Sequence, residues 1–295
     1  MAAEAPVTDP FEEYWDLLFG ISYRMLGTVA DAEDVVQETW LRWRQADPGE
    51  VANPRGYLVR AVTRTAIDHL RRSRARREEY VGPWLPEPLL TSPDVADTVA
   101  LAESVDMAFL VMLEALSPVE RAVFVLHEVF AIPYPEIAGT VGRSHSSVRQ
   151  IGHRSRQRVE GRQQRYRLGR RERREAVEHF VSACLDGDLD ALLRVLAPEV
   201  TMWADSDGKS ETPRVPLHGA RTVAEYFASV AALYPPDVSM RVAEINGGPA
   251  AVVVANGTVF AVVGVDVEPS GGRWRITAVR AVRNPAKLRR IPVQG

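Results

Sequence analysis

The chain has 295 residues, enough for two or three domains, and its hydrophobic fraction of 46% allows each domain to bury a core. No apolar run reaches the roughly 18 residues of a membrane-spanning helix, and the N-terminus lacks the pattern of a secretory signal. The single cysteine, Cys184, excludes an internal disulfide framework, so we expect a cytoplasmic protein without membrane attachment.

The net charge of -3 conceals an uneven distribution of basic residues. Arginines gather at 71–77 and again at 143–174, and each cluster ends a predicted helix, whereas acidic residues gather at 31–38 and 87–106. An arginine cluster is often only a solvated face. Two such clusters favour a surface that binds nucleic-acid phosphates.

The first 78 or so residues have helical periodicity, and residues 31–43 are the most informative part. At helical spacing, one face of this segment is acidic and another is apolar. The acidic face carries Asp31, Asp34 and Glu38, and the apolar face carries Val36, Trp40 and Trp43. The simplest interpretation is an amphipathic helix that packs on a core.

A second helix is predicted from Asn53-Pro54, because asparagine is a good N-cap and proline is tolerated at the first helical position. Polar residues then recur every three or four positions and form one ridge: Arg60, Arg64, Asp68 and Arg71. Arginines in such a ridge can hold the phosphates of a single strand beside a pocket for a flipped base. Asp68 has an alternative role as the salt-bridge partner of its neighbours.

Residues 80–97 are predicted to be a linker, because 80–94 contain four prolines and a glycine. Tyr80, Trp84 and Leu85 make the linker apolar enough to dock on another part of the protein.

Residues 116–159 predict a helix-turn-helix. Ser117 begins a capping box, Gly142 makes the turn, and Ser144 caps a helix that buries Val148 and Ile151. The residues left to contact bases and phosphates are Ser146, Ser147, Arg149, Gln150, His153 and Arg154.

After about residue 173 the pattern changes to three amphipathic helices and then four β-type segments, which predicts an α+β domain with an antiparallel sheet and a buried Cys184 thiol. Asp205, His179, His218 and Trp203 are residues of this domain that could serve acid–base chemistry or line a site for it. None of these residues has a spacing that requires catalysis. We therefore expect no catalytic residue, metal site or cofactor.

Three segments resemble parts of bacterial sigma factors. Residues 31–43, DAEDVVQETWLRW, resemble the region-two helix that binds the clamp helices of RNA polymerase. The resemblance implies that this surface comprises Asp31, Glu33, Asp34, Gln37 and Glu38. Residues 53–72 resemble the part of region two that melts and reads the minus-ten element, which implies DNA contacts by Arg60, Arg64, Asp68, Arg71 and Arg72.

Residues 116–159 resemble region four, which reads the minus-thirty-five element. Two positions depart from that pattern: Pro135 replaces a usual acidic residue, and Gly152 replaces a common leucine at a cost of roughly 1 kcal/mol in helix propensity. Only about 25–35 residues separate the two regions, so region three is absent. That layout is typical of the extracytoplasmic-function group.

Residues 174–284 resemble a SnoaL-like domain of the NTF2-like cone fold, as in sigma factors of the SigJ or ECF41 type. The resemblance implies a cone that encloses a pocket, which Asp205, His179, His218 and Trp203 could line. Three short signatures accompany it: YVGPWLPEPL at 80–89, NPAKL at 284–288 with Ala286 for aspartate, and DSDGKS at 205–210, where Ser206 and Asp207 replace glycines. They imply a regulatory interface made of Trp84, Leu85, Asp205, Asp207, Gly208, Lys209, Asn284, Pro285, Lys287 and Leu288.

We therefore predict a multidomain fold with all-α sigma regions followed by an α+β SnoaL-like domain. The expected boundaries are 8–78 for region two, 79–104 for the linker, 105–169 for region four and 170–288 for the regulatory domain. The predicted partners are core RNA polymerase and promoter DNA, with an intramolecular contact between the SnoaL-like domain and the sigma domains. The alternative is a small-molecule-binding or isomerase-like cone tethered to a DNA-binding module.

Overall fold

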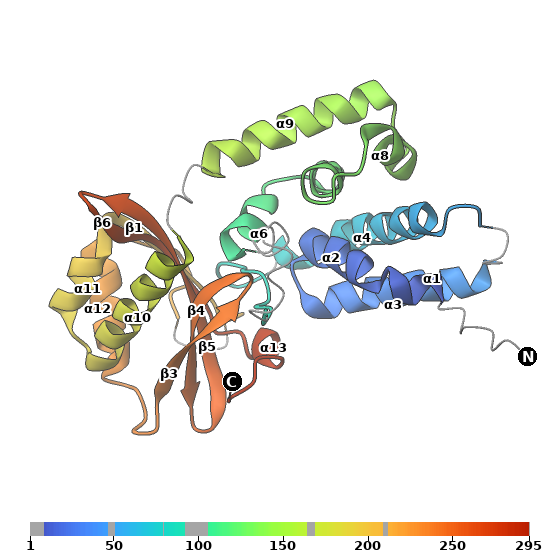
Figure 1. Cartoon of the computed structure of the whole chain (residues 1–295). Helices are drawn as coiled ribbons and strands as arrows, with labels where there is room; N and C mark the ends of the chain where they lie inside the picture. The colour runs from blue at the N-terminus through green and yellow to red at the C-terminus, as the bar shows by residue number, and fades with distance from the viewer. Residues whose placement is uncertain are drawn as a thin grey trace, which may run out of the picture. The chain divides into compact units, whose positions relative to one another are not determined.

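The computed structural model describes residues 9–46, 51–78, 80–91, 106–163, 169–208 and 212–294 (Figure 1). The chain divides into two compact units. The helical unit comprises Met1–Arg76 and Leu113–Val159, and the α+β unit comprises Arg77–Met112 and Glu160–Gly295. The described part of the predicted linker, residues 80–91, therefore belongs to the α+β unit.

The N-terminal part of the helical unit consists of α1 (Pro10–Glu13), α2 (Trp15–Leu26), α3 (Val29–Gln45) and α4 (Pro54–Glu78). Asn53 caps α4 as predicted, since its side chain accepts a hydrogen bond of 2.9 Å from the Gly56 amide. The core between these helices includes the fully buried side chains of Leu18, Trp43 and Leu58.

Val36 and Trp43 lie on the buried face of α3 as expected, with exposures of 3% and 0%. The expectation is wrong for Trp40, which is 39% exposed and has the Arg44 guanidinium 5.9 Å from its ring centre. Trp40 lies about 40° around the helix from Val36, at the edge of the stripe, so its ring reaches solvent.

The C-terminal part of the helical unit follows α6 (Met107–Leu113) and consists of α7 (Pro118–Phe124), the π-helix η3 (Val125–Val129), α8 (Tyr134–Val141) and α9 (His145–Gln163). The predicted capping box is present, because Ser117 and Glu120 each bond the other's backbone amide. Gly142 ends α8 in the left-handed conformation, with φ of 66°, and makes the turn into α9.

The α+β unit places α10 (Arg170–Asp186), α11 (Leu189–Val195) and α12 (Ala220–Ala231) against a six-stranded sheet of order β2-β1-β6-β5-β4-β3. The strands are β1 (Leu196–Asp205), β2 (Leu217–His218), β3 (Ser239–Ile245), β4 (Gly248–Ala255), β5 (Thr258–Ser270) and β6 (Arg273–Val282). The sheet is antiparallel as predicted except that β1 pairs parallel with β6. The long connection from β1 to β6, through β2, α12, β3, β4 and β5, permits this parallel pairing, which a hairpin does not.

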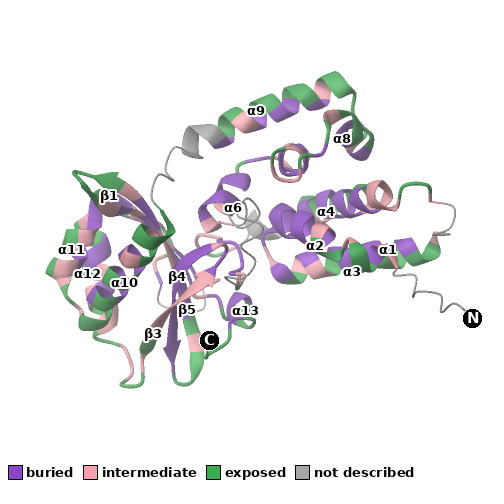
Figure 2. Ribbon diagram, in the orientation of Figure 1, coloured by how far each residue is buried: buried purple, intermediate pink, exposed green. Residues whose placement is uncertain are grey.

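Side chains alternate between the two faces of this sheet, as the pleat of a strand requires. Met202, Val253 and Ala281 pack against the helices, in a core that also buries Cys184. The opposite face carries Val252 and Val282. It is covered by Leu85 of the linker, by Met107 at the start of α6, and by residues of α13 (Pro285–Leu288) and the following tail. Both faces of β4 are therefore buried, as its colouring in Figure 2 shows.

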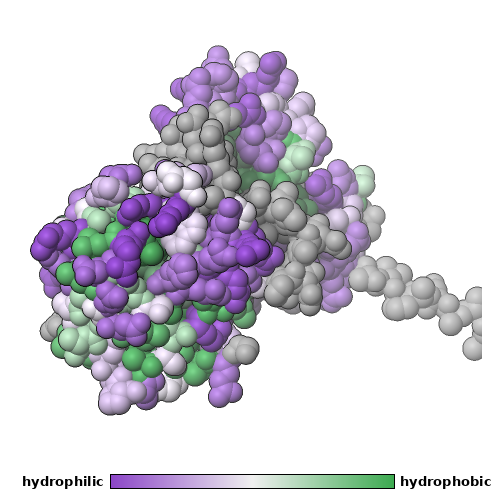
Figure 3. Space-filling model, turned by 60° about the vertical axis from the view of Figure 1, so that its left-hand side comes forward, coloured by the Kyte–Doolittle hydropathy of each residue, from purple (hydrophilic) through white to green (hydrophobic). Residues whose placement is uncertain are grey.

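The outer surface of the α+β unit mixes hydrophobic and hydrophilic side chains, as the lobe nearest the viewer in Figure 3 shows. Leu233 and Val215 are its most exposed large hydrophobic residues, at 75% and 68%. Among the described residues, no helix has both the length and the apolar content needed to span a membrane.

Candidate functional site

A shallow groove of the kind expected for contact with nucleic acid lies along the exposed face of α9. Figure 2 shows the exposed positions along this helix. Five of the six predicted contact residues line it: Ser146, Arg149, Gln150, His153 and Arg154. Ser147 is half-buried instead, and its backbone amide donates to the Ser144 hydroxyl at 3.3 Å, which completes the helix cap. The groove therefore combines two permanent positive charges with side chains that both donate and accept hydrogen bonds.

The buried face of α9 explains its unusual glycine. Val148 and Ile151 face the core as predicted, at 0% and 9% exposure. A Cβ on Gly152 would lie 2.6 Å from the Tyr134 hydroxyl, because Tyr134 from α8 fills the space beside the helix. The Tyr134 ring also stacks on His127 of η3, with ring centres 3.8 Å apart. Pro135 lies within the first two positions of α8, where it is tolerated.

The acidic face of α3 divides into exposed and structural positions. Asp34 and Gln37 are exposed, whereas Asp31, Glu33 and Glu38 are half-buried. Asp31 accepts from the Thr28 hydroxyl at 2.6 Å, and its other oxygen lies 3.1 Å from the His69 ring nitrogen. Asp31 therefore has a structural role at the start of α3 that the sequence pattern does not reveal.

The polar ridge of α4 is present, since Arg60, Arg64, Asp68, Arg71 and Arg72 are all exposed. Asp68 forms the alternative salt bridge considered above, with 3.1 Å between its carboxylate and Arg71. Arg64 points elsewhere: its guanidinium donates to the Thr140 carbonyl at 2.8 Å and to the Gly139 carbonyl at 3.0 Å.

In the α+β unit, the linker segment 80–91, called the strap below, is fixed to the sheet through Asp205 at the end of β1. Asp205 is 0% exposed and accepts hydrogen bonds from the Leu85 amide at 2.7 Å and from the Tyr80 hydroxyl. The Lys287 ammonium lies 2.7 Å from the same carboxylate. Because three donors surround it, the buried charge of Asp205 is compensated.

Lys287 connects the strap to α13. Its ammonium donates to the Leu85 carbonyl at 2.5 Å and lies 4.2 Å from the ring centre of Trp84. Asn284 caps α13 through the Ala286 amide and donates to the Tyr80 hydroxyl at 2.9 Å. Burial and the hydrogen bond to Asp205 raise the pKa of Tyr80 well above its ordinary value. The strap signature and the NPAKL signature therefore meet in one polar cluster.

The far end of the strap pairs with the edge of the sheet. Leu90 forms an antiparallel bridge with Ile245 at the end of β3. The Asn246 amide donates to the Leu89 carbonyl at 2.7 Å, and the Thr91 amide donates to the Glu244 carbonyl at 2.9 Å. The sequence analysis expected Tyr80 to dock as an apolar linker residue but did not foresee its hydrogen bonds to Asp205 and Asn284. Thr91 and Asn246 were not expected at this contact, and nothing in the sequence pattern marks them.

The loop after β1 also touches the strap. Asp207 and Gly208 both have positive φ, of 54° and 66°. A Cβ on Gly208 would lie 2.9 Å from a methyl carbon of Val81, so the close approach requires glycine here. Lys209, which we predicted for the same interface, lies outside the described residues.

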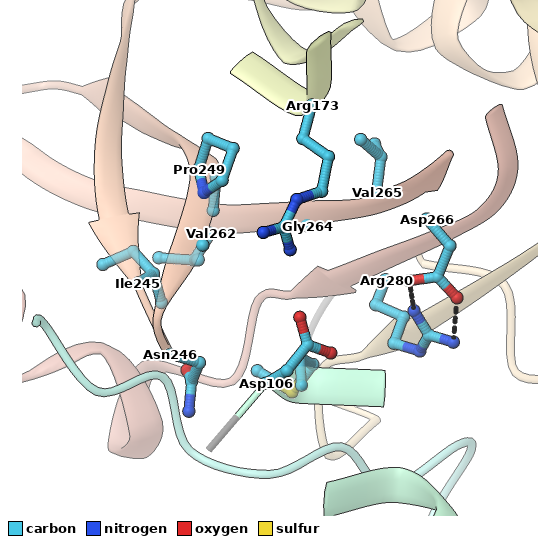
Figure 4. A pocket seen from close by; sticks show the side chains of 13 residues that line it. Asp106, Arg173, Ile245, Asn246, Pro249, Val262, Gly264, Val265, Asp266 and Arg280 are labelled. Carbon is cyan, nitrogen blue, oxygen red and sulfur yellow. Dashed lines mark hydrogen bonds and ion pairs between the residues drawn. The ribbon is translucent and has the colours of Figure 1, made fainter. Parts of the chain in front are cut away.

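A small cavity of about 40 Å³ lies on the strap side of the sheet (Figure 4). Its polar lining includes Asp106, Arg173 and the buried ion pair of Asp266 with Arg280, whose two hydrogen bonds measure 2.6 and 2.8 Å. This volume suits one or a few water molecules rather than an organic ligand.

The four residues that could have lined a pocket do not come together. Asp205 is covered by the strap, and Trp203 lies on the same face of the sheet. His179 is exposed on α10, and His218 is exposed on β2. The helix side of the sheet is packed with apolar side chains. Within the described ranges no cluster of three or more histidine, cysteine or acidic residues could hold a metal ion.

Comparisons with known proteins agree with this division of the chain. Residues 11–76 match the family Sigma-70 region 2, residues 106–159 match Sigma-70, region 4, and residues 177–284 match the SnoaL-like domain. The chain is 38% identical over 244 residues to the ECF RNA polymerase sigma factor SigJ of Mycobacterium tuberculosis, which covers 80% of this chain and 78% of SigJ. It is 36% identical over 209 residues to the probable ECF RNA polymerase sigma factor SigI of that organism, covering 70% and 72% of the two chains. The crystal structure of SigJ superimposes with a TM-score of 0.73 and 34% identity, over 94% of this chain and 96% of SigJ.

Proposed function

The chain belongs to the extracytoplasmic-function (ECF) RNA polymerase sigma factors, and we propose from this membership how its parts divide the work. It is a transcription initiation factor rather than an enzyme. In the proposal, region two (α1–α4) binds core RNA polymerase and the minus-ten element, and region four (α7–α9) binds the minus-thirty-five element. The fused SnoaL-like domain regulates both. The protein acts in the cytoplasm, where the polymerase is.

The groove of α9 is the observation that carries the DNA-binding part of this proposal. Five polar or basic side chains converge there from consecutive turns of one helix, which is how a recognition helix presents itself to the major groove. Arg149→Ala or Arg154→Ala should weaken binding to the promoter duplex. Loss of a phosphate contact lowers the slope of log K against log salt by roughly 1, and loss of a base contact relaxes specificity at one position.

Arg221→Ala supplies a matched control, because Arg221 is an exposed arginine of α12 that pairs with its helical neighbour Glu225. It should leave duplex binding unchanged. If the two α9 variants behave like this control, α9 is not the recognition helix.

The polymerase-binding proposal rests on α3. Asp34 and Gln37 project into solvent beside Trp40 and Leu41, which are 39% and 48% exposed. Acidic groups beside exposed apolar ones suit a protein interface with a polar rim. Asp34→Lys with Glu38→Lys should abolish most capture of core polymerase in a pull-down. Glu225→Lys on α12 is the control, and equal capture by all variants would exclude this face.

The regulatory part rests on the strap. It joins region two to region four, so a domain that binds it controls the connection between the two DNA readers. Tyr80, Leu85, Leu89 and Thr91 all bond residues of the SnoaL-like domain or its tail. We therefore propose that the SnoaL-like domain contacts the sigma regions as well and shifts the population between a restrained form and one open to polymerase.

A further inference from the structure

We propose that the cavity beside Gly264 binds a small planar oxyanion that both accepts and donates hydrogen bonds, as bicarbonate does, and that the bound ion stabilises the far end of the strap. In the proposed site, Arg173 binds the negative charge and Asp106 accepts the hydrogen bond of the ion's hydroxyl group. All the residues that line the cavity belong to the α+β unit. The surfaces proposed for polymerase and DNA belong to the helical unit.

The sheet itself creates the cavity. Gly264 of β5 pairs with Ala250 of β4 on one side and with Arg280 of β6 on the other. Because directly paired residues project to the same face of a sheet, the glycine and the alanine leave a gap that larger side chains would fill. A Cβ built on Gly264 meets no atom within 4 Å. The ion pair of Asp266 with Arg280 lines one end of this gap and adds no net charge to it.

The positive charge of the cavity comes from Arg173 at the start of α10. The neighbouring arginines of this helix pair with carboxylates: Arg170 with Glu244, Arg171 with Glu175 and Arg174 with Glu178. Arg173 instead turns its guanidinium into the cavity (Figure 4). Among the described residues, its buried Nε has no hydrogen-bond acceptor. Because a buried donor without an acceptor costs free energy, this position favours an anion or an ordered water molecule.

The acceptor on the opposite side of the cavity is Asp106, which directly precedes α6. Its Oδ1 accepts from the Ala108 amide at 2.8 Å, which fixes the carboxylate. Its Oδ2 lies 3.9 Å from the position of a Cβ built on Gly248, and Nη1 of Arg173 lies 3.8 Å from the same position. Figure 4 shows these two side chains pointing toward one another across the cavity. An ion between them can therefore contact both.

The two charged groups determine which kind of ion fits. A guanidinium donates two parallel hydrogen bonds to a planar oxyanion. A carboxylate only accepts hydrogen bonds, so it repels an oxyanion that carries no hydrogen. Bicarbonate suits both groups, whereas nitrate has a similar shape and the same charge but no hydrogen. A volume that suits a few water molecules also admits one ion of this size.

The cavity also adjoins the far end of the strap through Asn246. The Asn246 amide donates to the Leu89 carbonyl at 2.7 Å, and its side-chain oxygen accepts from the Leu89 amide at 3.0 Å. Asn246 lines the cavity together with Asp106 and Arg173. Because a ligand stabilises the conformation that it binds, an ion in the cavity should oppose local opening of this end of the strap.

Calorimetric titration of the full-length protein with sodium bicarbonate tests the site. Sodium nitrate is the matched probe, and the bulky gluconate ion maintains the ionic strength. We expect bicarbonate to bind with a dissociation constant on the order of millimolar, because the ligand is small, and at least about tenfold more tightly than nitrate. Equal binding of the two ions overturns the proposed class of ligand. If bicarbonate does not bind at up to roughly 50 mM, the cavity holds only water and the proposal fails.

Two substitutions test whether the ion lies in this cavity. Arg173→Gln removes the charge, and Gly264→Ala places a methyl group where no atom lies within 4 Å. Both should weaken bicarbonate binding at least about tenfold and leave the protein folded. Arg171→Gln is the matched control, because Arg171 is 91% exposed on the same helix, and it should bind like wild type. If Arg173→Gln also binds like wild type, the ion does not lie in the cavity.

Asp106→Asn should reverse the preference between the two ions. Asparagine keeps an oxygen that accepts from the Ala108 amide, and it presents an amide nitrogen to the cavity in place of the second oxygen. The variant should therefore bind nitrate more tightly than bicarbonate. An unchanged preference overturns the role of Asp106.

Hydrogen exchange tests the effect on the strap. At about ten times the dissociation constant, bicarbonate should slow exchange of the Leu89 amide in wild type by up to about tenfold and should have no effect in Arg173→Gln. If bicarbonate binds and exchange at Leu89 is unchanged in wild type, the ion does not stabilise the strap and that part of the proposal fails.

Discussion

The ion pair of Asp205 and Lys287 is buried on both sides, with side-chain exposures of 0% and 8%. Removing one partner of such a pair leaves an uncompensated charge in the interior, which costs about 3–5 kcal/mol. We predict that Lys287→Met lowers the melting temperature of the α+β unit by roughly 10 °C in calorimetry. Arg194→Ala is the control and should have little effect, because Arg194 and its partner Asp188 are both exposed and lie 3.9 Å apart.

The double variant Asp205→Ala with Lys287→Met separates the ion pair from other effects. Because the two groups interact directly, the double variant should be less destabilised than the sum of the single variants. If the loss of unfolding free energy in the double variant equals the sum of the two single losses, the two side chains act independently.

Because of the Tyr80 phenol, we expect the stability of the folded strap to depend on pH in the alkaline range. Its pKa is raised above the ordinary value of 10.0, so the folded protein holds the proton more tightly than the unfolded chain. The corresponding stability is complete below pH 10.0 and is lost as the pH rises above it. Between about pH 9 and about pH 11, wild type should lose more unfolding free energy than Tyr80→Phe in urea titrations. If the unfolding free energy falls equally with pH in the two proteins, ionisation of the phenol does not disturb the strap.

At the scale of elements, α8 and α9 pack closely because the large Tyr134 side chain of α8 lies against Gly152 of α9, which has no side chain. Gly152→Leu must displace the Tyr134 ring and should cost about 1–3 kcal/mol by overpacking, measured by thermal unfolding. Tyr134→Ala in the same chain should restore part of that loss.

Gly139→Ala on α8 is the matched control for this prediction. A Cβ at Gly139 meets no atom within 4 Å, so alanine should stabilise the helix by about 0.5–1 kcal/mol. If Gly152→Leu is as well tolerated as this change, the packing of Tyr134 does not explain the glycine.

The elements most readily predicted from sequence are those whose signals are local. Asn53, Ser117 and Ser144 cap helices where expected, because a capping side chain bonds an amide only two or three residues away. Trp40 and the parallel pairing of β1 with β6 escaped prediction, since each depends on which neighbour an element meets. The family and its sigma factor function followed from dense motifs, whereas the roles of individual contact residues stay predictions.

At the scale of the whole molecule, the proposed regulation places the strap between the SnoaL-like domain and the two sigma regions. Leu85 is 2% exposed and packs in the same apolar cluster as Leu288, and Trp84 packs against the Lys287 ammonium. Trp84→Ala with Leu85→Ala should release the strap and change run-off transcription with core polymerase. Truncation after Asn284 should change it in the same direction, because it removes Lys287 from the other side of the contact.

Small-angle scattering provides the structural measurement for these variants. A released strap should give a broader distance distribution and a larger radius of gyration than wild type. If the variants have the same compact scattering profile as wild type and transcribe equally well, the strap only links the domains and has no regulatory role.

The strap and its partner are far apart in the order of synthesis. The Leu85 carbonyl and the Lys287 ammonium that bonds it are separated by 202 residues. At about 5–20 residues per second, a ribosome needs roughly 10–40 seconds to cover that distance. Both promoter-reading regions are therefore complete before the residue that fixes the strap exists. Each newly synthesised chain therefore passes through a stage in which Lys287 does not yet fix the strap. A chain whose synthesis stops before Lys287 lacks this contact permanently.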